Sequence, residues 1–178
     1  MTDLEARLRR VEDQLAIRQL VAEYGFAVDA HDLDRLASLF TPDAVWDMAN
    51  GTMRMEGRDE VIRRYGAVIQ TYGPSNHIAH HQAIYLDDVD PDRATGLVNG
   101  HAEVWLDERP LLAALLYDDA YRRFEGSWRF ARRTMSFLYY LDVREYAEVL
   151  GDPYRVRAYG SPRLADIPEV LMKEHRDA

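Results

Sequence analysis

The chain has 178 residues, of which 47% are hydrophobic and 30% charged, a composition typical of one folded domain. Its formal net charge of -9 argues against nucleic-acid binding, because phosphate recognition needs a basic surface. The lack of cysteine excludes disulfides, a thiolate nucleophile and cysteine-based metal centres.

The first part of the chain has helical periodicity. Residues 2–5 fit a capping box, and apolar residues from Leu4 to Val28 keep helical spacing, which predicts one long first helix. A second helix is expected over about 33–40, ended by Thr41-Pro42-Asp43, and a third over about 59–71. Between these two helices, Ala44 to Met48 is predicted to form a strand.

From His77 onward the pattern is typical of strands. Four long strands are predicted, roughly over residues 77–87, 93–106, 111–124 and 127–141. Tight turn signals separate them, so an antiparallel meander is expected. Helices followed by a curved sheet predict an α+β fold in which helices and sheet form a cone.

The last segment differs from the rest. Residues 142–178 have a short helical pattern near 143–150 and then three prolines, so they cannot form one continuous element. We therefore expect one domain over residues 1–141 and a tail over 142–178 that packs on the domain or on a neighbouring subunit.

Four of the six histidines, His77, His80, His81 and His101, fall on the first two long strands. On a regular strand His77 and His81 share one face while His80 lies on the other, so the three converge only if a bulge intervenes. A metal site requires its ligands to converge on one point, so no metal is expected here.

Asp29 follows the apolar or small residues Phe26, Ala27 and Val28 at the end of the first helix. Either Asp29 or Asp32 caps the second helix, or Asp29 points into a cavity and hydrogen-bonds a histidine, as a general base requires. Tyr24, five residues earlier, is either a core aromatic residue or a donor that polarises a carbonyl.

Several segments of the chain have a familiar pattern: Ile17–Tyr24, Asp29–Leu36, Phe40–Trp46, Gly57–Ile62, His77, Asp92–Gly96 and Gly126–Phe130. In these segments the sequence resembles the SnoaL-like proteins of the NTF2-like superfamily. The resemblance covers roughly residues 4–141. It implies a cone whose curved, mostly antiparallel sheet wraps around the N-terminal helices and a central pocket.

In that superfamily, scytalone dehydratase, hexachlorocyclohexane dehydrochlorinase and bile-acid 7α-dehydratase carry an Asp and a His at the positions of Asp29 and His77. The bile-acid enzyme also has a tyrosine matching Tyr24. The resemblance implies a cofactor-independent lyase or isomerase in which His77, oriented by Asp29, removes a proton while Tyr24 donates a hydrogen bond. This chain departs from the bile-acid enzyme at Ala102, where that enzyme has an acid; His101 or His81 is a secondary candidate.

The expected ligand is a hydrophobic polycyclic or aromatic molecule. The residues predicted to line its pocket are Phe26, Trp46, Met48, Met53, Met135 and Phe137. Two alternatives stay open: a non-catalytic ligand-binding or assembly protein of the same fold, and a partner like the β-subunit of ring-hydroxylating dioxygenases.

Three further expectations concern the oligomeric state, the location and the surface charge of the protein. Six apolar strand residues exceed what a small cone should hide and predict a homodimer or homotrimer: Trp105, Leu112, Leu115, Tyr117, Trp128 and Tyr139. With neither a signal peptide nor a membrane-spanning segment recognisable, a cytoplasmic location is expected. Arg122, Arg123, Arg132 and Arg133 are interpreted as a solvated, ion-paired surface.

Overall fold

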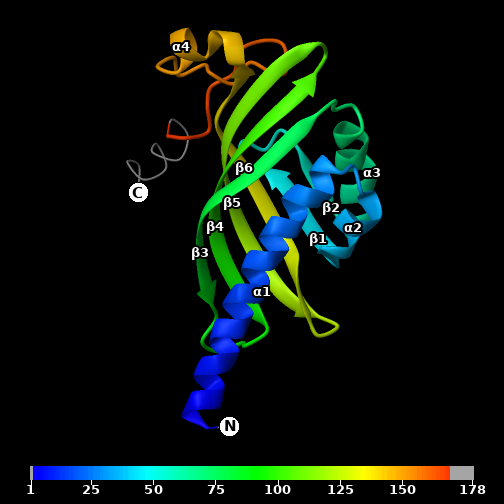
Figure 1. Cartoon of the computed structure of the whole chain (residues 1–178), viewed down its shortest axis with the longest axis vertical. Helices are drawn as coiled ribbons and strands as arrows, with labels where there is room; N and C mark the ends of the chain where they lie inside the picture. The colour runs from blue at the N-terminus through cyan, green and yellow to red at the C-terminus, as the bar shows by residue number, and fades with distance from the viewer. Residues whose placement is uncertain (1, 169–178) are drawn as a thin grey trace.

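A single six-stranded sheet organises the computed structural model, which describes residues 2–168 (Figure 1). Its strand order is β2-β1-β6-β5-β4-β3. The strands are β1 (Phe40–Met48), β2 (Arg54–Glu56), β3 (Ser75–Leu86), β4 (Arg93–Leu106), β5 (Arg109–Phe124) and β6 (Ser127–Asp142). The strands β3 to β6 form the expected antiparallel meander, and β1 adds to β6 in parallel.

Three helices cover one face of this curved, unclosed sheet, which confirms the predicted α+β cone (Figure 1). They are α1 (Asp3–Asp29), α2 (Leu33–Ser38) and α3 (Arg58–Ile69). The short α4 (Tyr146–Val149) follows β6 and packs on the other face. The predicted capping box is present, with Thr2 and Glu5 bonded reciprocally. None of the helices within residues 2–168 is long and apolar enough to cross a bilayer.

Two predicted boundaries are wrong. The second helix ends at Ser38, and Phe40 begins β1, because its backbone pairs with Phe130 of β6. Thr41-Pro42-Asp43 therefore lies inside β1, where the pairing register shifts between Phe40 and Val45 and tolerates a proline without an N–H. The three-residue strand β2 was not predicted, since it is too short to show a periodicity.

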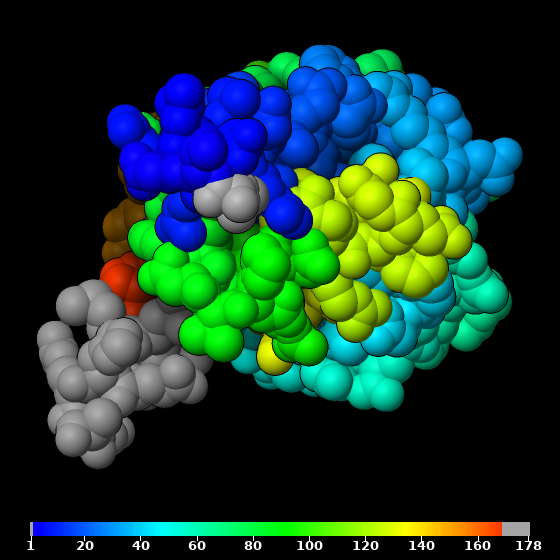
Figure 2. Space-filling view, turned by 90° about the horizontal axis from the view of Figure 1, so that it is seen from below, coloured from blue at the N-terminus to red at the C-terminus, as the bar shows by residue number. Residues whose placement is uncertain are grey.

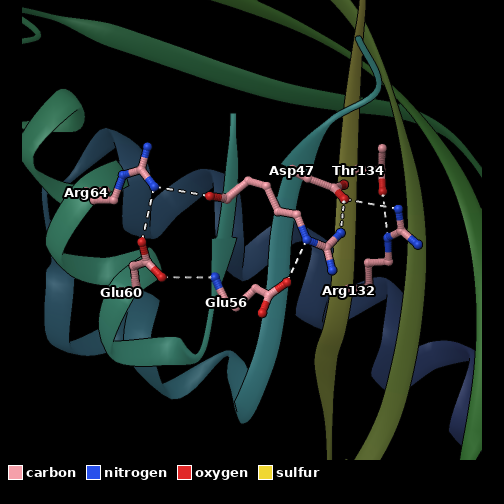
Figure 3. Close-up of polar contacts among 7 residues, drawn as sticks. Asp47, Glu56, Glu60, Arg64, Arg132 and Thr134 are labelled. Atoms are coloured by element: carbon pink, nitrogen blue, oxygen red, sulfur yellow. Dashed lines mark hydrogen bonds and ion pairs between the residues drawn. The ribbon is translucent and has the colours of Figure 1, made fainter. Parts of the chain in front are cut away.

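Polar contacts fix the β2 edge of the sheet (Figure 3). The buried Asp47 of β1 accepts hydrogen bonds from Arg54 of β2 and Arg132 of β6, both at 3.0 Å. Glu60 of α3 accepts a 3.2 Å bond from the backbone N–H of Glu56. These bonds tie β2 and α3 to the edge of the sheet.

The lower end of the cone is closed by α1 and two strand turns, which lie against one another in Figure 2. Asp13 of α1 accepts hydrogen bonds from Trp128 Nε1 at 3.0 Å and from Arg123 at 2.5 Å. Arg10 bonds Asp88 in the β3–β4 turn at 3.0 Å. Before this anchor the helix is solvated, so the apolar residues Leu4, Leu8 and Val11 are exposed despite their helical spacing.

The tail crosses the opposite end of the sheet. After the 3-10 turn Val143–Glu145 and α4, Val156 forms bridges with Tyr140 and Arg163. Asp166, 1% exposed, accepts a 2.8 Å bond from the backbone N–H of Phe137. Residues 143–168 thus lie on the domain, and the remainder of the predicted tail, 169–178, is outside the described residues.

Most of the apolar strand residues that predicted an oligomer are buried within one chain. Leu115, Tyr117 and Trp128 belong to the core under the helices, and Tyr139 packs with α4 on the other sheet face. Trp105 is 46% exposed. A monomer therefore hides more of this surface than the sequence pattern suggested.

Candidate active site

Asp29 and His77 are in direct contact. Asp29 ends α1, and His77 is the third residue of β3. The Asp29 Oδ1 atom lies 2.6 Å from His77 Nδ1, and Oδ2 accepts a 2.8 Å bond from the His77 backbone N–H. Ser75 Oγ donates to Oδ1 at 2.9 Å. The two side chains are largely buried, at 21% and 12% exposed.

The position of Asp29 is not explained by helix capping. Asp32, not Asp29, caps α2, by accepting a 2.9 Å bond from the Arg35 backbone N–H. Asp29 stands at the C-terminal end of α1, where the helix dipole disfavours a negative charge. The carboxylate is therefore held in place by its bonds from His77 and Ser75.

Electrostatics fix the protonation pattern of the pair. Burial raises the pKa of Asp29, but hydrogen bonds from the His77 ring and backbone outweigh it, so the net pKa is below the ordinary value. An ionised Asp29 only accepts, so a His77 ring that carries a single proton carries it on Nδ1. Nε2 is then the free base nitrogen, and the ring makes no other hydrogen bond within residues 2–168.

The close approach of α1 to β3 depends on Gly25. A Cβ atom at this position would lie 2.9 Å from the backbone oxygen of His77. Only a residue without a side chain lets the helix pass so close to the strand that carries the histidine. The glycine therefore sets the distance between Asp29 and His77.

Replacement of Gly25 by alanine is expected to push α1 away from β3. We expect a loss of about 1–3 kcal/mol in the free energy of unfolding, as is usual for overpacking. The matched control is Gly66→Ala in α3, whose new Cβ would meet the movable side chain of Leu33. Urea unfolding of both variants checks this, and equal stabilities would contradict it.

A cavity of about 300 Å³ lies between α1 and the sheet beside His77. Its lining includes Tyr24, His77, Gln82, Gly100, Tyr117 and Arg133. Phe26, predicted as a pocket residue, lies at the rim and is 62% exposed, because it faces outward from the last turn of α1.

A second, smaller cavity of about 80 Å³ also has His77 in its wall. The structure places the other five predicted lining residues around it: Trp46, Met48, Met53, Met135 and Phe137. The ring of Tyr72 is stacked with that of His77, with 6.4 Å between the ring centroids. Tyr159 of the tail also lines this cavity. His77 thus lies between one cavity with both polar and apolar lining residues and a second that is rich in aromatic residues.

Tyr24 is 2% exposed and reaches the first cavity from α1. Its ring packs edge-on against Phe40 and Phe130. Its hydroxyl lies near those of Tyr65 and Tyr117 but makes no hydrogen bond of normal geometry with residues 2–168. The O–H group is therefore available to a bound molecule.

Arg133 is not on a solvated surface, contrary to the sequence interpretation. It is fully buried, and its Nε and Nη2 atoms bond Asp119 at 2.9 and 2.8 Å. Burial lowers the pKa of Arg133, but the Asp119 charge outweighs it and raises the pKa overall. The guanidinium stacks on Tyr24 and Tyr117, and Nη1 has no hydrogen-bond partner within residues 2–168. This free donor belongs to a residue that lines the first cavity.

The secondary histidines do not join the Asp29–His77 pair, although His101 is among the residues that line the first cavity and His81 is not. His101 bonds His80 at 2.7 Å and Tyr139 at 3.1 Å, and pairs with Ile78 on the sheet face opposite His77. The pKa of His101 is lowered, mainly by burial and to a smaller extent by the nearby His80. His81 is exposed in a β3 bulge. Neither ring bonds the Asp29–His77 pair, and no group of three metal-ligand side chains converges within residues 2–168.

The geometry agrees with comparisons to known proteins. The SnoaL-like domain model matches residues 9–134. The chain belongs to the SnoaL-like family. An uncharacterized protein of Mycobacterium tuberculosis is 31% identical over 126 residues, which is 69% of this chain and 84% of that protein.

One further relative and one solved structure have names that describe an activity. Gamma-hexachlorocyclohexane dehydrochlorinase of Sphingobium indicum is 28% identical over 148 residues, covering 79% of this chain and 87% of the enzyme. The structure of a scytalone dehydratase-like protein of Novosphingobium aromaticivorans matches with a TM-score of 0.69 and 20% identity, covering 75% of this chain and 89% of that one. The structural match shows the NTF2-like fold alone. The distant sequence relatives of this chain thus include a dehydrochlorinase.

Proposed function

We propose that the protein is a cofactor-independent lyase or isomerase that acts on a hydrophobic ring compound. The observation that carries the proposal is the Asp29–His77 pair, in which Asp29 holds Nδ1 and leaves Nε2 free in the wall of two cavities. A histidine fixed in one tautomer is what a general base requires. The similarity to a dehydrochlorinase supports elimination chemistry.

In the proposed step, His77 Nε2 takes a proton from a carbon next to an electron-withdrawing group. The electron pair of the broken C–H bond forms a C=C bond. In an elimination the leaving group departs with its own bonding pair. In an isomerisation the charge moves onto a carbonyl oxygen, and His77 then returns the proton to another carbon. The free N–H of Arg133 and the O–H of Tyr24 are the donors that stabilise this charge.

Deuterium exchange tests proton removal without knowledge of the natural substrate. The probe is 4-phenylcyclohexanone in D₂O, an uncharged ketone with acidic α-protons and an aromatic ring. We expect the wild type to accelerate exchange of the α-protons, followed by NMR. The proposal fails if the ketone binds in the cavity, as seen by chemical-shift changes, and exchanges no faster than in buffer.

Tyr24→Phe separates the hydroxyl from the ring. Because the hydroxyl makes no normal hydrogen bond inside the protein, we expect the unfolding free energy to stay within about 0.5 kcal/mol of wild type. Exchange is expected to slow by roughly tenfold or more, as one donor to the developing charge is lost. A large loss of stability with unchanged exchange would assign Tyr24 to the core alone.

A further inference from the structure

A bulge in β3 decides which residue beyond His77 faces the first cavity. Ala79 pairs with Gly100, and the next pair is Gln82 with Val98, so His80 and His81 together oppose Asn99. A regular strand would continue the inward face from Ala79 to His81. The extra residue turns His81 away and brings Gln82 to the inner face instead.

The side-chain oxygen of Gln82 has no partner in the described part of the protein. This atom, Oε1, is buried, although the residue lines the cavity. The backbone of Gln82 pairs with Val98 of β4, and its backbone oxygen also accepts a 3.2 Å bond from Arg18 of α1. A buried amide oxygen without a partner is costly in a folded protein, which suggests that its partner is a ligand.

Gln82 stands at the other end of the cavity from the base. His77 pairs with Ala102 and Gln82 with Val98, which are four residues, or roughly 13 Å, apart along β4. Between them lies Gly100, where a Cβ atom would come within 3.1 Å of Ile78 O and Leu115 Cδ1. A side chain at this position would collide with both atoms, so the backbone of β4 itself lines the cavity between its two ends, where an elongated molecule would lie.

The charges around the cavity favour an uncharged molecule. With His77 neutral, the Asp29–His77 pair carries one negative charge, and the Arg133–Asp119 pair carries none overall. A carboxylate in this cavity would add a second unpaired negative charge in a poorly solvated place. A neutral carbonyl or halide can still accept from Arg133 and gain charge only as the reaction proceeds.

We propose that Gln82 determines specificity by binding a hydroxyl group of an uncharged substrate, at the end of the molecule remote from the carbon that loses its proton. A hydroxyl fits because it donates to an amide oxygen and also accepts from an amide N–H. The proposal rests on the proposed function for the reacting end of the molecule, and it adds the group at the other end.

The test compares two probes that differ by one hydroxyl, 4-phenylcyclohexanone and 4-(4-hydroxyphenyl)cyclohexanone. Dissociation constants for wild type, Gln82→Leu and Gln82→Met are measured by calorimetry. The wild type should bind the hydroxyl compound about tenfold more tightly, and both variants should bind the two compounds equally. The variants should also melt at or above the wild-type temperature, because they remove an unsatisfied group.

His77→Gln distinguishes failure of this inference from failure of the proposed function. That variant should lose α-proton exchange and keep the tenfold preference for the hydroxyl compound. A preference that persists in Gln82→Leu and Gln82→Met, or that is absent from the wild type, overturns the role of Gln82. A clear drop in melting temperature of both apolar variants would also overturn it, by showing that the amide is structural.

Discussion

Substitution of His77 by glutamine is expected to slow α-proton exchange of 4-phenylcyclohexanone by about 100- to 10,000-fold. Glutamine keeps a polar side chain of similar reach but has no basic nitrogen. The ketone should still bind within about threefold of its wild-type affinity, because the apolar cavity walls are unchanged. An exchange rate equal to that of wild type would remove His77 from the mechanism.

Asp29→Asn is the companion change, because it keeps the shape of the side chain. The amide can donate to Nδ1 and so place the histidine proton on Nε2, where it blocks the base. We expect an exchange rate close to that of His77→Gln. Ser75→Ala is the control: it removes one bond to Asp29 and leaves the bond to the ring, so its rate should stay near wild type.

The second large effect concerns the buried pair of Arg133 and Asp119. Arg133→Met leaves the Asp119 carboxylate buried without its cation, which should cost about 3–5 kcal/mol of unfolding free energy. The double variant with Asp119→Leu removes both charges and should recover most of that loss. Urea unfolding of the two variants measures the difference.

The double variant also separates stability from function. It is expected to fold and bind 4-phenylcyclohexanone, yet to exchange its protons slowly, since the free Nη1 donor is gone. Exchange at the wild-type rate in a folded double variant would show that the buried pair is only a structural device.

Much of the fold follows from local pattern in the sequence. The capping box and the apolar spacing up to Val28 predict α1, and turn residues between strands predict the meander. These signals depend on residues close together in the sequence, so they can be recognised without knowledge of the tertiary structure. The parallel pairing of β1 with β6 depends on contacts between distant segments, and no local pattern indicates it.

Part of the candidate site could also be predicted from the sequence. Asp29 and His77 stand out as polar residues in apolar or histidine-rich surroundings, and the family resemblance linked them. Arg133 was misassigned, although strand alternation places it on the same face as Met135 and Phe137, both predicted to line the pocket. Strand alternation therefore indicates that Arg133 faces inward, but the charge of an arginine favours a surface position.

Gln82 could not be predicted. Regular alternation from His77 leads to His81, and only the paired strand β4 shows that two residues of β3 oppose Asn99. A bulge is a property of two strands together, so one strand's sequence does not reveal its position. Regular alternation makes His81 a candidate, whereas the bulge turns it out of the cavity.

The central claim is that Asp29 fixes His77 with a free Nε2, and ¹⁵N NMR of the histidine ring tests it without any substrate. At pH 8, where an ordinary histidine is neutral, we predict a protonated Nδ1 and an unprotonated Nε2 for His77 in the wild type, reversed or mixed in Asp29→Asn. A wild-type ring with its proton on Nε2 would contradict the account, because that nitrogen could not accept a proton from a substrate.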